Sequence, residues 1–241
     1  MAAEGMVAEG LLRELRARIR AIESGAGAAG REVAGLGAGL EAELPWSGLP
    51  RAALHEVSGE AASGFVAALA GRLAGRGGAL VWCRSPLLER RLGALYGPGT
   101  RAFGLDWRRL VLVRARDERE VLWAAEEALR CPAVAGVVVE LARSLDLLAS
   151  RRLQLAAEAG GAAGLLLRPG PPDPAPNAAL TRWRAEPDPW GGLHHWRLDL
   201  WRCKGGAPRS WRVGWDEQAL AFALAAPVAD RADATRRRAA G

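Results

Sequence analysis

The segment from Leu54 to Leu69 has the order strand, glycine-bounded loop and helix, and it spaces Gly59 and Gly64 as a phosphate-binding loop does. In such loops, backbone N–H groups and the N-terminus of a helix hold the phosphates of a nucleotide. The loop residues are Gly59, Glu60, Ala61, Ala62, Ser63, Gly64, Phe65 and Val66. Phosphoryl transfer is therefore the first chemistry to consider for this chain.

Two positions of this loop lack the side chains that this chemistry needs. Phe65 stands where a lysine would neutralise the β- and γ-phosphates, and Val66 stands where a hydroxyl would bind Mg²⁺. Loss of these charge-assisted contacts weakens ATP binding by roughly 3 kcal/mol or more. We therefore predict no catalytic residues, no cofactor, no nucleotide hydrolysis and weak or absent ATP binding. The alternative interpretation is a pair of glycines that meets the spacing by chance.

The remaining candidates for chemistry give weaker signals. Glu140 follows the apolar run Val137–Val139, at a position where an acidic residue would hold Mg²⁺ through water, or where it serves the end of a strand. His194 and His195 have no Cys, Asp or Glu at the spacing of metal ligands, so we expect a surface or hairpin-capping role. No serine lies in a G-x-S-x-G elbow. The sequence predicts neither a metal site nor a nucleophile.

Apolar runs that suit strands alternate with helical patterns through the middle of the chain. The expected elements, strand then helix in each pair, are Leu54–Val57 and Gly64–Ala74, Ala79–Cys83 and Leu87–Leu95, Leu110–Val113 and Glu118–Leu129, Val134–Leu141 and Leu145–Ala159, followed by a strand at Gly164–Leu167. This alternation predicts an α/β fold with a mostly parallel sheet flanked by helices. An exposed proline-rich loop is expected at Arg168–Pro176.

The region Thr181–Asp216 has a different composition and contains six of the ten tryptophans. Apolar residues alternate with polar ones on both sides of Gly205 and Gly206, so two strands each have one apolar face. These faces consist of Trp196, Leu198 and Leu200 on one strand and Trp211, Val213 and Trp215 on the other. The pattern predicts a C-terminal antiparallel hairpin added to the sheet.

Both ends of the chain differ from this core. An amphipathic helix is expected near the N-terminus, where Leu11, Leu15, Ile19 and Ile22 form an apolar stripe that is a candidate partner-binding surface. The stretch Gly25–Gly39 resembles a linker. We therefore predict residues 1–43 as helix and linker, 44–216 as the core domain and 217–241 as a C-terminal extension.

The overall charge and the C-terminal arginines bear on binding to nucleic acid. The net charge is +6 and the pI about 10.4, and the last residues include Arg231, Arg236, Arg237 and Arg238. Such a tail suits non-specific contact with DNA phosphates, or it is a solvated end or a peptide that docks on a protein. Three unpaired cysteines and the absence of a signal-peptide or membrane-span pattern lead us to expect a cytoplasmic protein without membrane contact.

Several stretches resemble the ImuA family. The segment Leu44–Pro50 looks like the start of a domain of the RecA and SulA type. Arg151–Glu158, leading to Leu165–Pro169, is similar to a helix and strand of ImuA proteins, as are Thr181–Arg184 and Trp211–Asp216. The resemblance covers about Leu44 to Asp216.

This resemblance implies a RecA-like core and a role as an SOS-induced accessory factor in translesion DNA synthesis. The implied partners are ImuB, a relative of Y-family polymerases without catalytic residues, an error-prone replicative-type polymerase, and RecA. The chain departs from active RecA proteins at Phe65, Val66 and Glu140, and it has Arg84-Ser85-Pro86 where RecA carries a glutamate that activates water. We therefore expect a non-catalytic adaptor. The alternatives are a SulA-like inhibitor of cell division and a true ATP-dependent recombinase.

Overall fold

The computed structural model describes residues 32–75, 77–189 and 191–225 and has an α/β fold built on one nine-stranded sheet. In chain order the elements are β1 (Val33–Ala34), α2 (Ala38–Ala42), β2 (Leu49–Pro50), β3 (Leu54–Ser58), α3 (Ala62–Ala74), β4 (Ala79–Arg84), α4 (Pro86–Leu92), α5 (Gly97–Arg101), the 3₁₀ turn η1 (Trp107–Arg109), β5 (Leu110–Arg114), α6 (Glu118–Arg130), β6 (Val134–Glu140), α7 (Leu147–Gly160), β7 (Ala163–Arg168), β8 (Thr181–Pro187), β9 (His195–Cys203), β10 (Arg209–Asp216) and β11 (Ala221–Leu224). No helix within these ranges combines the length and the apolar character needed to cross a bilayer.

The large sheet has a parallel part and an antiparallel part. Its strand order is β11-β10-β9-β8-β3-β7-β6-β4-β5, and every neighbouring pair from β8 to β5 is parallel. Strands β8 to β11 pair antiparallel. The predicted mostly parallel sheet and C-terminal hairpin are confirmed. The sequence did not single out β8, which runs beside the central strand β3 and joins the two parts.

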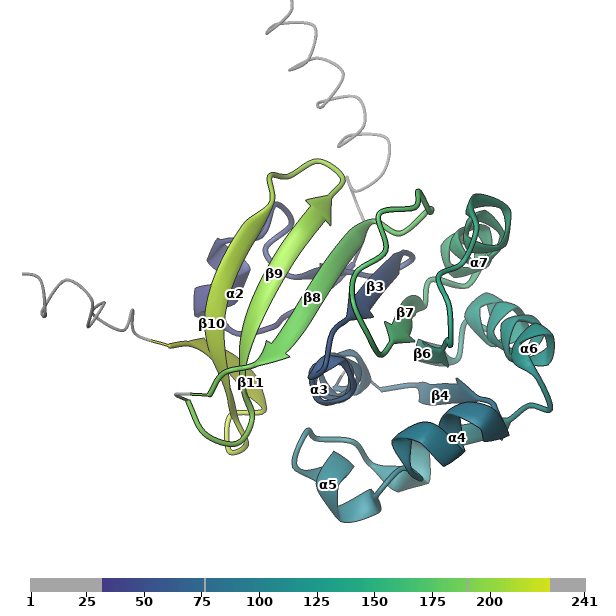
Figure 1. Cartoon of the computed structure of the whole chain (residues 1–241), viewed down its shortest axis with the longest axis horizontal. Helices are drawn as coiled ribbons and strands as arrows, with labels where there is room; N and C mark the ends of the chain where they lie inside the picture. The colour runs from purple at the N-terminus through teal and green to yellow at the C-terminus, as the bar shows by residue number, and fades with distance from the viewer. Residues whose placement is uncertain (1–31, 76, 190, 226–241) are drawn as a thin grey trace, which may run out of the picture.

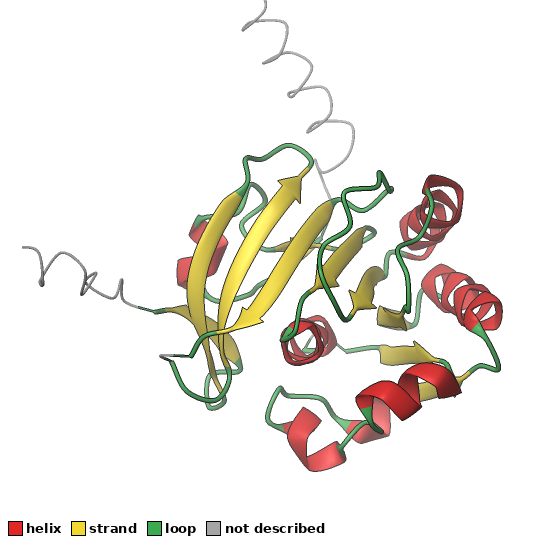
Figure 2. Ribbon diagram, viewed as in Figure 1, coloured by secondary structure: helices red, strands yellow, loops and turns green. Residues whose placement is uncertain are grey.

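Helices cover the parallel sheet on both faces, as Figures 1 and 2 show. The run Val137–Val139 in β6 explains why, because all three side chains are buried and successive residues point to opposite faces. Val138 packs into the cluster around α3, whereas Val137 and Val139 pack into the cluster under α6 and α7. An unbroken apolar run is what a strand covered on both faces requires.

Local signals in the sequence fix the ends of several helices. Asp117 and Asp146 accept hydrogen bonds from backbone N–H groups in the first turns of α6 and α7, and Ser85 does the same for α4. Gly161, in the left-handed conformation, ends α7. Helix α4 ends before Gly93, where φ is 83°, so it is shorter than the sequence predicted.

The packed part of the chain extends past the predicted core at both ends. Leu36 and Leu40 are fully buried, although they lie in the region assigned to a linker and N-terminal segment. At the other end, β11 pairs with β10, and Phe222 is buried in the core. Helix α2 packs against β11, and Phe222 N–H donates to the carbonyl of Leu36, so these two ends support each other. The sequence did not predict the burial of Leu36, because its neighbours are small residues and no apolar periodicity surrounds it.

Candidate functional site

The loop between β3 and α3 is pressed against the end of β8. Gly59 has φ of 110°, and a Cβ atom at this position would lie 2.2 Å from the carbonyl oxygen of Ala185. The Gly59 N–H donates to the carbonyl of Gly170 at 2.7 Å. Only glycine fits this backbone conformation and this approach. The connection between β3 and α3 therefore uses this glycine for a close contact inside the protein.

The amide groups that follow Gly59 also have partners within the chain. Ala61 N–H donates to the carbonyl of Ala185 at 3.0 Å, and Ala62 N–H donates to that of Gly59 at 3.3 Å. Glu60 N–H donates to Oε2 of Glu186 at 3.4 Å, so a carboxylate lies beside the loop. A bound phosphate would compete with these acceptors and would meet a negative charge.

Phe65 and Val66 face the interior from the first turns of α3. Both side chains are fully buried. The ring of Phe65 lies 5.7 Å from that of Trp183, 6.1 Å from Trp196 and 5.4 Å from Phe222, measured between ring centroids. Such tilted and edge contacts add about 0.5–1.5 kcal/mol per pair beyond burial. The position where a lysine would reach phosphates belongs to an aromatic core.

The ends of β4 and β6 carry a buried ion pair. Arg84 and Glu140 are 1% and 3% exposed, and Nη2 of Arg84 lies 3.2 Å from Oε2 of Glu140. Trp82 donates from Nε1 to Oε1 of Glu140 at 2.7 Å. Burial raises the pKa of Glu140, although the contacts with Trp82 and Arg84 oppose this shift. Glu140 thus contacts two other side chains at the end of β6, and the Arg84 guanidinium lies directly beside its carboxylate.

Comparison with known proteins identifies relatives of this chain. No family model matches it. Two curated proteins of Caulobacter vibrioides, both named Protein ImuA, from strain NA1000 / CB15N and from strain ATCC 19089 / CIP 103742 / CB 15, are each 39% identical to it. Each alignment covers 70% of this chain and 77% of the relative.

The chain belongs to the ImuA family.

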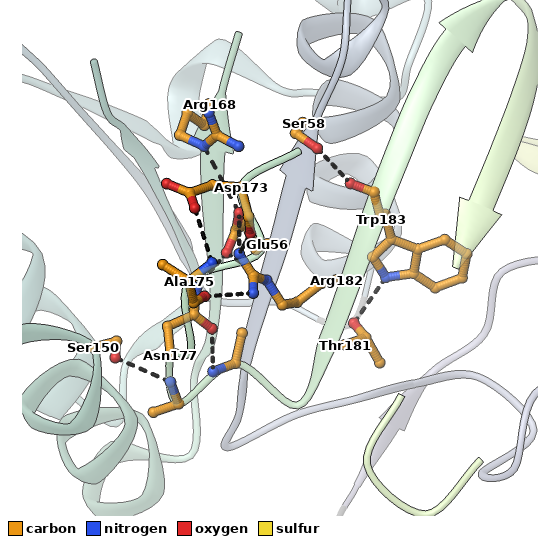
Figure 3. A network of polar contacts seen from close by, with 12 residues as sticks. Glu56, Ser58, Ser150, Arg168, Asp173, Ala175, Asn177, Thr181, Arg182 and Trp183 are labelled. Carbon is orange, nitrogen blue, oxygen red and sulfur yellow. Dashed lines mark hydrogen bonds and ion pairs between the residues drawn. The ribbon is translucent and has the colours of Figure 1, made fainter. Parts of the chain in front are cut away.

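A buried polar network holds the proline-rich loop of this ImuA-family chain against β3 and β8 (Figure 3). Arg182 is fully buried and donates from Nε to Oε2 of Glu56 at 3.0 Å and from Nη2 to Oε1 at 3.1 Å. It also donates to the backbone carbonyls of Asp173 and Ala175. The guanidinium carbon lies 4.2 Å from the ring centroid of Trp201. Hydrogen bonds from the buried Arg182 side chain thus hold the loop expected at Arg168–Pro176.

Sequence reasoning missed this network because arginines in strands ordinarily mark exposed faces. Glu56 also accepts a hydrogen bond from the Asn177 side chain and lies 3.7 Å from Nε of Arg168. No local pattern marked Arg182, because its strand also carries Thr181, Arg184 and Glu186.

Several histidines and cysteines among the described residues are packed against or hydrogen-bonded to other parts of the protein. Among the described residues no group of three or more His, Cys, Asp or Glu side chains is placed to hold a metal ion. His55 is buried and contacts the Thr181 hydroxyl and the Pro50 carbonyl. His194 contacts Glu217 and packs on Phe103. Burial raises the pKa of Cys83 to about 12, which keeps it a thiol rather than a nucleophilic thiolate.

The predicted partner-binding residues lie outside the described part of the chain. These are Leu11, Leu15, Ile19 and Ile22 at the N-terminal end and Arg231, Arg236, Arg237 and Arg238 at the C-terminal end. Their roles stay predictions.

Proposed function

We propose that this chain is a non-catalytic adaptor of translesion DNA synthesis. Membership of the ImuA family supports this role. The proposed partners are an ImuB-like, catalytically inactive relative of Y-family polymerases, an error-prone replicative-type polymerase, and RecA. The proposal includes a RecA-like core whose phosphate loop has become a structural connection, and it places the protein in the cytoplasm. Contact of the basic tail with DNA is part of the same proposal.

The burial of Phe65 carries the non-catalytic part of the proposal. A lysine at this position would place its ammonium group among Trp183, Trp196 and Phe222. Burying an unpaired charge costs several kcal/mol or more, so this core and a nucleotide-binding lysine exclude each other. The intramolecular partners of the loop amides support the same conclusion. The loop supplies no lysine at position 65 and no hydroxyl at position 66, and the N–H groups from Gly59 to Ala62 already have acceptors within the chain.

The pairing of Arg84 with Glu140 supports the proposal in a second way. A Mg²⁺ ion near the end of β6 would need carboxylate oxygens and would be repelled by the adjacent guanidinium. Glu140 already contacts both Arg84 and Trp82. We infer that this acidic residue serves the fold and not a metal.

An adaptor needs exposed surface suited to protein contact, and helices α6 and α7 offer it. Trp123 on α6 is 62% exposed, and Leu148 and Leu155 on α7 are 74% and 49% exposed. The two helices pack side by side, and Arg152 on α7 bridges to Glu126 on α6 at 2.6 Å. Tryptophan is enriched at binding hot spots, and large exposed apolar groups mark interaction sites. This surface is the best candidate among the described residues for contact with a polymerase partner.

The test combines nucleotide assays with partner capture on the full-length protein. Calorimetry with MgATP should show no binding at micromolar concentrations, and phosphate release should not exceed that of buffer. Micromolar affinity for ATP would refute the non-catalytic part. Capture of the tagged protein from DNA-damaged cells, followed by mass spectrometry, should recover the ImuB-like and polymerase subunits. Recovery of a tubulin-like division protein in their place would favour the SulA-like alternative.

A further inference from the structure

Strand β5 forms one edge of the nine-stranded sheet, and in the described part of the chain it pairs with β4 alone. All of its residues but the last are apolar, and Val111 is 50% exposed. The opposite edge strand, β11, is covered, because α2 packs against it and the Phe222 N–H donates to the Leu36 carbonyl. Folded proteins ordinarily cover or charge such an edge, since its backbone groups can pair with another strand. Among the described residues, β5 is therefore the open apolar edge of the sheet.

The backbone of β5 presents hydrogen-bonding groups to this open side. The Ala115 N–H, just past the strand, donates to the carbonyl of Arg84 on β4 at 3.0 Å. Backbone groups of successive residues in a strand point to opposite sides, so Val113 also faces β4, whereas Leu112 and Arg114 face away from it. The N–H and carbonyl groups of these last two residues are placed to pair with an added extended segment, as in β-augmentation.

Arginines flank both ends of this edge. Residues 107–116 include four arginines and no acidic residue. Arg108 is exposed before the strand, and the Arg114 side chain is 60% exposed at its end, where it pairs with Glu89. Solvent screens an exposed ion pair of this kind, so Arg114 can exchange it for another carboxylate at little cost. Pairing of β5 with β5 of a second copy would bring two such arginine-rich segments together, which is unfavourable. The charges favour an acidic occupant.

A hollow of about 550 Å³ lies at the start of β5. Leu105 and Leu220 line it with apolar groups, and Arg101 and Arg108 line it with positive charge. Asp106 also lines it, and its carboxylate accepts a hydrogen bond from the Arg108 N–H in the turn that leads into the strand. A hollow with apolar walls and two guanidinium groups suits an apolar side chain that has a carboxylate beside it. A segment paired with β5 would bring its end residues to this place.

We propose that β5 binds an extended segment of a partner protein, apolar at its centre and acidic at both ends, as an added strand of the sheet. The centre of the segment pairs with the backbone of Leu112 and Arg114 and covers the apolar edge. Its acidic ends lie near Arg108 and Arg114, so the same segment fits in either strand direction. The site uses other residues than the α6–α7 surface and does not depend on a role in translesion synthesis.

The first test uses labelled peptides and the full-length protein. The acidic probe is EEVLVTLEE, and the basic analogue is KKVLVTLKK. A third probe is the acidic peptide with an N-methyl group on every central residue, which keeps the charge and removes the backbone donors. Fluorescence anisotropy should show saturable binding of the acidic probe and at least about tenfold weaker binding of each of the other two. Equal binding of the N-methylated probe would mean that charge alone attracts the peptide, and equal binding of the basic probe would remove the role of the arginines. Either result would overturn the proposal.

Hydrogen exchange and a matched pair of variants locate the contact. Exchange of the Leu112 N–H, followed by NMR, should slow at least about tenfold when the acidic probe saturates the native protein, because this group becomes hydrogen-bonded. Val111→Glu puts a negative charge on the edge and should weaken binding of the acidic probe at least about tenfold. Leu148→Glu makes the same change of charge at an exposed position on α7 and should leave binding unchanged.

Three outcomes would show that the peptide or the occupant is assigned wrongly. Unchanged exchange at Leu112, or full binding by a folded Val111→Glu protein, would place the peptide elsewhere. A dimer of the native protein in sedimentation that Val111→Glu dissociates would make a second copy the occupant of β5. The nucleotide and partner-capture assays above do not use these probes, so failure of this inference would leave the proposed function standing.

Discussion

Arg182 binds Glu56 through two hydrogen bonds in a place where neither side chain reaches solvent appreciably. The pair joins β8 to the central strand β3, and β8 is the strand through which the antiparallel part meets the parallel part. The same guanidinium holds the loop after β7 through the carbonyls of Asp173 and Ala175. One arginine therefore connects three segments that are far apart in the sequence.

Replacing this arginine should destabilise the fold strongly. Arg182→Met leaves the Glu56 carboxylate buried with its main partner removed, and breaking a buried ion pair in this way costs about 3–5 kcal/mol. The free energy of unfolding from urea titration measures the effect. The double variant Glu56→Gln/Arg182→Met removes the stranded charge, so it should be more stable than Arg182→Met alone.

An exposed ion pair provides the control. Arg116, just before α6, forms an exposed ion pair with Glu120 in the first turn of that helix. Arg116→Met should change the free energy of unfolding little, because solvent screens such pairs. Equal losses for Arg182→Met and Arg116→Met would show that the buried network does not stabilise the protein as argued.

Gly59, at the start of the loop between β3 and α3, should matter for folding and not for partner binding. Gly59→Ala forces a side chain to a φ of 110° and within 2.2 Å of the Ala185 oxygen, so we expect a loss of about 1–3 kcal/mol or more from backbone strain and steric clash. Gly170 has a similar φ of 113° but open space around a Cβ atom. Gly170→Ala should therefore lower the free energy of unfolding less, because it introduces backbone strain without a steric clash. A well-folded Gly59→Ala protein that loses its partners would contradict this assignment.

Glu140 should give stability an unusual dependence on pH. Its pKa in the folded protein is raised above the ordinary value of 4.5, so the folded state holds its proton more firmly than the unfolded state does. Its stabilising contribution is therefore complete below pH 4.5 and is lost as the pH rises through the folded-state pKa. We therefore expect Glu140→Gln to become more stable relative to the native protein as the pH rises from 4. The free energies of unfolding of the two proteins, measured over this range, test this.

Glu120 should make stability depend on pH in the opposite direction. Its hydrogen bond with Arg116 lowers its pKa, so its contribution is present above the ordinary pKa and disappears as the pH falls through the folded-state value. Glu120→Gln should therefore match the native protein at low pH and become less stable than it as the pH rises, whereas Glu140→Gln should gain stability relative to the native protein over the same rise. Parallel pH profiles for the two variants would refute the assigned surroundings of Glu140.

The exposed tryptophan of α6 should contribute to partner binding. Trp123→Ala removes a side chain that is 62% exposed, so stability should change little while affinity for the ImuB-like partner falls about tenfold or more if the side chain is a hot spot. Surface plasmon resonance measures the affinity, and Trp107→Ala, which alters another partly exposed tryptophan, is the comparison. Unchanged affinity in Trp123→Ala would show that the partner binds a different surface.

The parallel sheet could be predicted from the sequence because its strands need unbroken apolar runs, of which Val137–Val139 is the clearest. The loop after β3 could be predicted from Gly59 and Gly64. The burial of Arg182 could not, since it depends on a partner 126 residues away. Leu36 was missed because a single apolar residue among glycines carries no periodic pattern, and its surroundings include β11, which lies near the other end of the chain.

Restoring the missing residues of the phosphate loop should unfold the protein rather than create an ATPase. Phe65→Lys places an ammonium group in the aromatic cluster with Trp183 and Phe222, at a cost of several kcal/mol, and Val66→Thr buries a hydroxyl beside it. Phe65→Leu keeps the position apolar and should lose much less stability, which separates the effect of charge from that of size. Thermal unfolding followed by circular dichroism, with calorimetry using MgATP, measures both properties. A folded Phe65→Lys/Val66→Thr protein that binds MgATP would mean that the loop can still open toward a nucleotide, and the interpretation of Phe65 as a core residue incompatible with phosphate binding would then be wrong.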